Sequence, residues 1–190
     1  SATVTLGAGN EIVTGSAGQD TIQTTADAGS TETVSLGAGT DTVNDANNIV
    51  ATATFDGGAG TDTLQYDSSV DVAAAGLAQT TGFDRILLAD NSADDGTAVE
   101  LTDAVVGGSD ADTITVESDG DSADVITVTA AVSAANTVIL ADGANSFTLA
   151  GDTRVTIGVD DADSDGDLAD ETSATVTLGA GNEIVTGSAG

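Results

Sequence analysis

One spacing constrains this chain more than any other feature of its sequence: like residues recur at positions i, i+21 and i+42. Over residues 1–65 four kinds of position follow this spacing: an aspartate, a glycine, an alanine and a branched apolar residue. They are Asp20, Asp41 and Asp62; Gly18, Gly39 and Gly60; Ala17, Ala38 and Ala59; and Ile22, Val43 and Leu64. A companion set runs through Glu11 and Glu32 and through Val13, Val34 and Phe55. A fixed period that places like above like is typical of stacked coils.

Within each period the apolar residues alternate with threonine. Examples are Thr3 to Leu6, Asp112 to Val116 and Val125 to Val128. In strands this alternation puts the apolar side chains inside and the threonines outside. We therefore expect an all-β fold, a parallel β-solenoid of about 21 residues per turn. The crossover rule for parallel strands predicts a right-handed coil.

A longer repeat contains the short one. Residues 1–18 reappear letter for letter as residues 173–190. We expect residues 1–172 to be one unit of a tandem array, with residues 173–190 starting the next unit. About eight turns, stacked at about 4.8 Å per strand, would extend roughly 40 Å.

The regularity varies along the unit. It is clear over residues 6–65, weak over 66–106 and looser over 107–159, and an acidic loop follows at 160–172. The same spacing returns in the looser part, where it predicts further stacking. The residues are Asp103, Asp124 and Asn145, with Val105, Ile126 and Phe147.

The charge balance narrows the function. There are 32 acidic residues against two cations, Arg85 and Arg154, which gives a net charge of −30. Nucleic acid and anionic membranes need a basic partner, so both are excluded, and no apolar run is long enough for membrane insertion. Because 39% of the residues are hydrophobic, the chain has material for a narrow core. Closing that core against carboxylate repulsion calls for a bound cation.

Catalysis is not expected. The chain has no His, Cys or Lys, so nucleophilic triads, thiolate sites and Schiff-base chemistry are unavailable. The glycine-rich loops are not phosphate cradles, because no Lys follows them.

One nonapeptide, Gly57 to Gln65 (GGAGTDTLQ), fits the pattern G-G-x-G-x-D-x-U-x at every defined position. Close variants lie at residues 6–14, 15–23 and 36–44, and residues 107–115 carry Asp110 in place of a glycine. In these residues the chain resembles the RTX family of secreted calcium-binding β-roll proteins. It departs from the family in three-residue inserts at 24–26 and 45–47, and in Ala53, which stands where a carboxylate is expected.

The resemblance implies that Ca²⁺ is the cofactor. A hard cation takes six to eight oxygens, and glycine turns can aim backbone carbonyls beside an aspartate carboxylate. Stacked loops would then complete a shell from two half-sites. The candidate ligands are Gly7, Gly9, Glu11, Gly18, Asp20, Gly37, Gly39, Asp41, Gly58, Gly60, Asp62, Asp110, Asp112 and Asp124.

A second calcium signal lies in the acidic loop. The run from Asp161 to Asp167 (DADSDGD) resembles the start of an EF-hand loop, without flanking helices. Its candidate ligands are Asp161, Asp163, Asp165 and Asp170. The alternative interpretation is a solvated acidic linker.

Three functions follow as hypotheses. The first is an extracellular or cell-surface structural repeat, secreted by a bacterium, that forms a filament, surface layer or adhesin stalk and becomes rigid on binding calcium. Its partners would be identical repeat units, with polysaccharide contact left open. The second is an ice- or glycan-binding solenoid, and the third is an acidic, disordered mineral-binding matrix protein.

Overall fold

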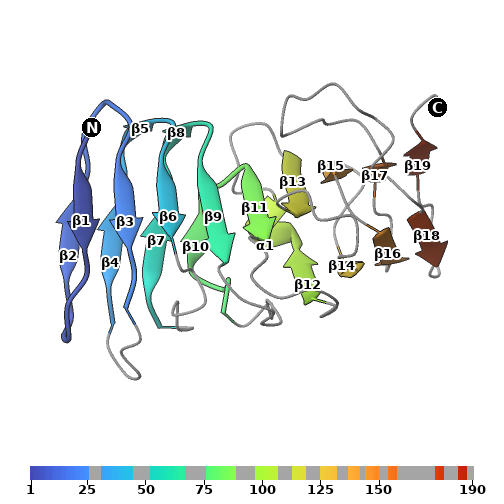
Figure 1. Cartoon of the computed structure of the whole chain (residues 1–190), viewed down its shortest axis with the longest axis horizontal. Coiled ribbons are helices and arrows are strands. Elements are labelled where there is room, and N and C mark those ends of the chain that lie inside the picture. Colours follow the sequence, from blue (N-terminus) through green and yellow to red (C-terminus); the bar gives the residue numbers. More distant parts are fainter. Residues whose placement is uncertain are drawn as a thin grey trace.

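In the computed structural model, nearly all of the regular secondary structure among the described residues consists of stacked parallel strands (Figure 1). The structure describes residues 1–25, 31–44, 52–66, 76–88, 97–106, 113–118, 125–131, 137–141, 144–149, 154–157, 174–177 and 184–187. Within these ranges the single helix is one turn long, α1 (Asp103–Val106). The expectation of an all-β fold is confirmed.

The chain alternates between two rows of strands (Figure 1). One row is a nine-stranded sheet of β1 (Thr3–Thr5), β3 (Thr21–Gln23), β6 (Thr42–Asn44), β9 (Thr63–Tyr66), β11 (Arg85–Leu88), β13 (Thr113–Ser118), β15 (Thr137–Ala141), β17 (Arg154–Ile157) and β19 (Ile184–Gly187).

The other row consists of two four-stranded sheets. The first contains β2 (Ile12–Thr14), β4 (Thr33–Ser35), β7 (Thr54–Asp56) and β10 (Thr80–Thr81). The second contains β12 (Thr97–Thr102), β14 (Val125–Ala131), β16 (Ala144–Leu149) and β18 (Ala174–Thr177). A two-stranded sheet of β5 (Ala38–Gly39) and β8 (Ala59–Gly60) joins the loops between the rows.

The strand register follows the period in the first part of the chain. Thr21 pairs with Thr42, Thr42 with Thr63, and Thr33 with Thr54, so the sequence number rises by 21 at each of these steps. Thr3 pairs with Thr21 at a step of 18. The predicted β-solenoid is therefore confirmed, and about three of its turns keep the predicted spacing of about 21 residues.

In the later part the strands stack in parallel as predicted, but their register does not keep the step of 21 residues. Phe147 pairs with Val128 rather than with Ile126, at a step of 19, and Val105 lies in α1 instead of a strand. Because side chains alternate with a period of two, a shift of two residues keeps the same face turned to the core. Apolar spacing alone could not distinguish these two registers.

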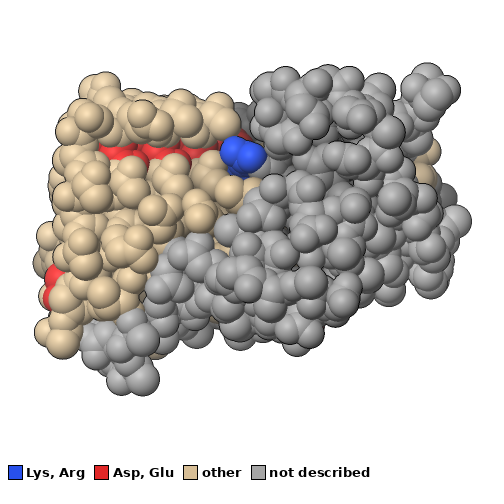
Figure 2. All heavy atoms as spheres, viewed as in Figure 1, with Lys and Arg blue, Asp and Glu red and all other residues tan. Residues whose placement is uncertain are grey.

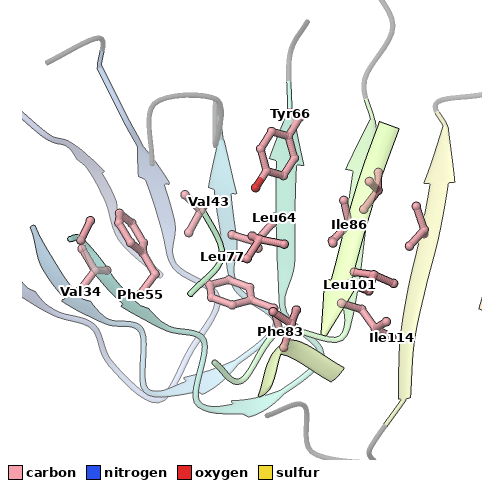
Figure 3. Packing of buried hydrophobic residues seen from close by; sticks show 14 of the residues in the cluster. Val34, Val43, Phe55, Leu64, Tyr66, Leu77, Phe83, Ile86, Leu101 and Ile114 are labelled. Atoms are coloured by element: carbon pink, nitrogen blue, oxygen red, sulfur yellow. The ribbon is translucent and has the colours of Figure 1, made fainter. Parts of the chain in front are cut away.

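Two rows of apolar side chains fill the interior. Val34 and Phe55 are register partners in one sheet, and Val43 and Leu64 in the other, and all four are almost fully buried (Figure 3). Burying one such side chain contributes about 1.5–3 kcal/mol. The same core extends into the less regular segment through Leu77, Phe83, Ile86, Leu101 and Val106.

Candidate metal site

The periodic aspartates stack along one edge of the solenoid. Six residues separate β2 from β3, β4 from β6 and β7 from β9, and the last residue of each segment is Asp20, Asp41 or Asp62. We call the loops 15–20, 36–41 and 57–62 the aspartate edge. The three side chains are 2%, 0% and 0% exposed, although they are ionisable.

Hydrogen bonds link these carboxylates into a ladder. The backbone N–H of Asp20 donates to Oδ1 of Asp41 at 2.6 Å, and that of Asp41 donates to Oδ1 of Asp62 at 2.8 Å. At the first coil the N–H of Ala2 donates to Oδ1 of Asp20 at 2.6 Å. Each aspartate thus accepts the N–H of the residue one coil before it, and this fixes the register between coils.

The backbone carbonyls of the same residues hold the next coil. The carbonyl oxygen of Asp20 accepts the N–H of Thr42 at 3.0 Å, and that of Asp41 accepts the N–H of Thr63 at 2.9 Å. Asp20 and Asp41 therefore each bind the coil before them through a carboxylate oxygen and the coil after them through the backbone carbonyl. The sequence predicted these aspartates only as ligands for a cation, and not as hydrogen-bond acceptors between coils.

Sequence reasoning also missed a fourth member of the ladder. Oδ2 of Asp84 accepts the N–H of Asp62 at 3.0 Å. Asp84 lies 22 positions after Asp62 and so falls outside the strict period. The available signal was its place directly before an apolar strand, β11, which matches the place of Asp20 before β3.

The second carboxylate oxygen distinguishes the coils. Oδ2 of Asp20 accepts the backbone N–H of Ser16 at 2.7 Å and is 3.0 Å from its hydroxyl. The Ser16 N–H lowers the pKa of Asp20 most; burial opposes this effect, and the Ser16 hydroxyl, the Ala2 N–H and the terminal ammonium add to it. Oδ2 of Asp41 is buried with no hydrogen-bond partner. Gly37 occupies the position equivalent to Ser16 there and has no hydroxyl.

Backbone oxygens surround the carboxylates where the loops are rich in glycine. A Cβ on Gly39 would lie 3.2 Å from Oδ1 of Asp41 and 3.0 Å from the carbonyl oxygen of Gly18. At Gly58, φ is +95° and a Cβ would overlap the carbonyl oxygen of Gly37. No side chain fits between these loops, so their oxygens stay close together.

The opposite edge carries a further carboxylate, Glu11, which is half-buried and has one buried oxygen. Oε1 of Glu11 lies 3.5 Å from the place of a Cβ on either Gly7 or Gly9, and Oε2 is buried with no hydrogen-bond partner. Glu11 therefore folds over its own loop. In the following coils the equivalent positions are Glu32, which is buried, and Ala53, which offers no carboxylate.

Figure 2 shows a recessed line of acidic atoms between two rows of uncharged atoms, ending at a basic group. Arg85 directly follows Asp84 in the chain. Within the described ranges, no group of three acidic side chains comes together in a way that could hold a metal ion. A cation on this edge would therefore need backbone carbonyls as well as carboxylates, as Ca²⁺ accepts.

The structure brings together the candidates of the first three coils. Gly18, Gly39 and Gly60 lie in stacked loops with Asp20, Asp41 and Asp62, and Gly37 lies against Gly58. The candidates Asp110, Asp112, Asp124, Asp161, Asp163, Asp165 and Asp170 lie outside the described residues.

No family profile matches the chain, and neither a curated protein nor a solved structure matches it significantly. No helix among the residues described is long and apolar enough to cross a membrane.

Proposed function

We propose that this chain is a calcium-binding structural repeat of an extracellular or cell-surface assembly, without catalytic activity. The observation that carries the proposal is the buried Oδ2 of Asp41, which has no hydrogen-bond partner inside a ladder of stacked carboxylates. A buried charge without a partner is costly, and a cation satisfies it. The chain itself has only two basic residues for 32 acidic ones.

Ion binding and folding would be coupled. Stacked strands lie about 4.8 Å apart, and two like charges at that distance repel by roughly 3 kcal/mol at an effective dielectric constant of about 20. A divalent ion between two loops replaces this repulsion by attraction, so its binding energy becomes folding energy. The chain would stay extended where calcium is scarce and stack into a rod outside the cell.

The loop chemistry favours Ca²⁺ over Mg²⁺. Asp41 and the carbonyls of Gly18 and Gly39 are oxygen donors of mixed type, and Ca²⁺ tolerates irregular shells of six to eight oxygens. Mg²⁺ demands a tight octahedron and keeps its waters. The same argument extends to Glu11 with the loop of Gly7 and Gly9.

Calcium titration of the whole chain tests the proposal. After chelation we expect weak β signal in circular dichroism, and added CaCl₂ should restore it and raise the melting temperature. MgCl₂ at equal ionic strength is the control. If chelator changes neither the β signal nor the melting temperature, the carboxylates are not ligands and the proposal fails.

One observation favours the second hypothesis, an ice- or glycan-binding face. Four threonines, Thr3, Thr21, Thr42 and Thr63, are successive register partners in the nine-stranded sheet. Such a row could bind an ordered surface if it were flat and open. However, Thr63 is only 7% exposed and the row ends at Arg85, so the calcium proposal is preferred.

A further inference from the structure

One sequence occupies two different places in the solenoid. Thr3 to Thr5 form β1 of the nine-stranded sheet, whereas the identical segment Thr175 to Thr177 belongs to β18, which pairs with β16 in the opposite row. Ile12 to Thr14 form β2 of a four-stranded sheet, whereas their copies, Ile184 to Thr186, lie in β19 of the nine-stranded sheet. Both strands of the repeated segment have changed sheets.

The exchange follows from counting turns. From β1 to β17 the chain returns to the nine-stranded sheet through β3, β6, β9, β11, β13, β15 and β17, and each return is one full turn. β18 follows β17 in the opposite row, half a turn later. The start of the second copy therefore lies seven and a half turns after the start of the first.

We infer that the repeat formed by residues 1–172 contains a half-integer number of turns, so that each unit of an array is rotated by half a turn relative to the unit before it. The inference rests on the proposed tandem array. The surface concerned is the coil end, and its partner is the next copy of the same repeat.

The register of the exchanged strands supports this half-turn offset. Val176 pairs with Phe147 and Val185 pairs with Val155, so apolar residues align with apolar residues in the new sheets. In the first copy Val4 pairs with Ile22 and Val13 with Val34. Because both strands alternate polar and apolar residues, either sheet accepts either strand.

The consequence concerns the charged edge. The loop 15–20 leads from β2 to β3, from the four-stranded side to the nine-stranded side. The copy of β2 in the next unit is β19, which belongs to the nine-stranded sheet, so the equivalent loop of that unit would lead the opposite way. Aspartate rows would therefore alternate between the two edges of the rod, and the structural period would be two units.

Cysteine pairs introduced into the whole chain test the half-turn offset between units. The chain has no cysteine of its own that could interfere. Thr148 and Thr177 are register partners here. If the repeat contained a whole number of turns, Thr177 would instead lie beside Thr156 of β17. Neighbouring strands are about 4.8 Å apart, within disulfide range. We expect T148C/T177C to oxidise at least tenfold faster than T156C/T177C, measured by gel shift in calcium buffer.

The pair T33C/T54C serves as the control, since Thr33 and Thr54 are exposed register partners in the regular coils. Oxidation of this pair in buffer shows that the solenoid has formed. The dependence of its oxidation rate on calcium tests the proposed function separately. The inference is overturned if T156C/T177C reacts faster than T148C/T177C. It is also overturned if neither reacts faster in buffer than in denaturant while T33C/T54C does.

Discussion

The two edges of the solenoid connect successive coils in different ways. On the aspartate edge each segment between strands has six residues, and stacked carboxylates accept the cross-coil N–H groups. On the opposite edge the segments 6–11, 24–32 and 45–53 have six, nine and nine residues. There neutral side chains connect the coils: Oδ1 of Asn10 accepts the N–H of Thr31 at 2.8 Å, and the Thr25 hydroxyl donates to the Leu6 carbonyl at 3.1 Å.

The comparison shows that constant loop length and aligned charge occur together. Stacked carboxylates need the same geometry in every coil, so that each one can accept the N–H group of the coil before it. Where loop length varies, as between Glu11 and Glu32, neutral hydrogen bonds hold the coils without such precision.

Substitution of Asp41 should give the largest effect. D41A removes the acceptor of the Asp20 N–H and leaves that group buried, which costs about 1–3 kcal/mol of unfolding free energy. D41N keeps an acceptor oxygen and removes one of the repelling charges, so its stability in chelator should be at least that of the wild type while its stabilisation by calcium falls. Denaturant titrations with and without CaCl₂ measure both. Equal calcium stabilisation of D41N and wild type would contradict the ladder as an ion site.

The G58A substitution should have the second-largest effect on stability. Gly58 has φ of +95° and its Cβ would meet the Gly37 carbonyl, so we expect a loss of more than about 1 kcal/mol. G7A on the opposite edge is the matched control, because a Cβ there has its nearest contact at 3.5 Å. Thermal melting compares the two. A G7A variant as unstable as G58A would show that the edges are equally tight.

Acid should weaken the aspartate edge through Asp20. Its pKa is lowered in the folded state from the usual 3.8, so the ionised carboxylate stabilises the fold above that value. This stabilisation disappears as the pH falls through the lowered folded pKa. S16A removes one of the hydrogen bonds that lower the pKa, and its acid unfolding midpoint should move to higher pH. Melting temperatures between pH 2 and 6 test this; an unchanged midpoint would contradict it.

N10A on the opposite edge should have the smallest effect. It removes one exposed hydrogen bond to Thr31, worth about 0.5–1.5 kcal/mol at most. Stabilisation by calcium should change little, because no charge is lost and the proposed ligands of this loop, Glu11 with Gly7 and Gly9, remain. A strongly reduced calcium response in N10A would contradict this expectation and would mean that the Asn10 amide itself takes part in ion binding.

Much of this architecture could be predicted from periodicity. The rows of Val43 with Leu64 and of Val34 with Phe55 follow directly from the spacing, because each pair must share one interior position. The hydrogen bond from the Asp20 N–H to Asp41 could not be predicted, since spacing shows which residues stack but not which atoms meet. Asp84 and the pairing of Val128 with Phe147 were missed because loop lengths change, while the alternation of strand residues stays satisfied.

The hydrogen bonds between coils run along the axis of the solenoid, and this has a mechanical meaning. Tension on the two ends of the chain would load the outermost coil first, because each coil is bound only to its neighbours. A released coil of about 21 residues would lengthen the chain by roughly 65 Å, from about 3.3 Å per extended residue less the strand spacing. Such a stack would give way one coil at a time under load.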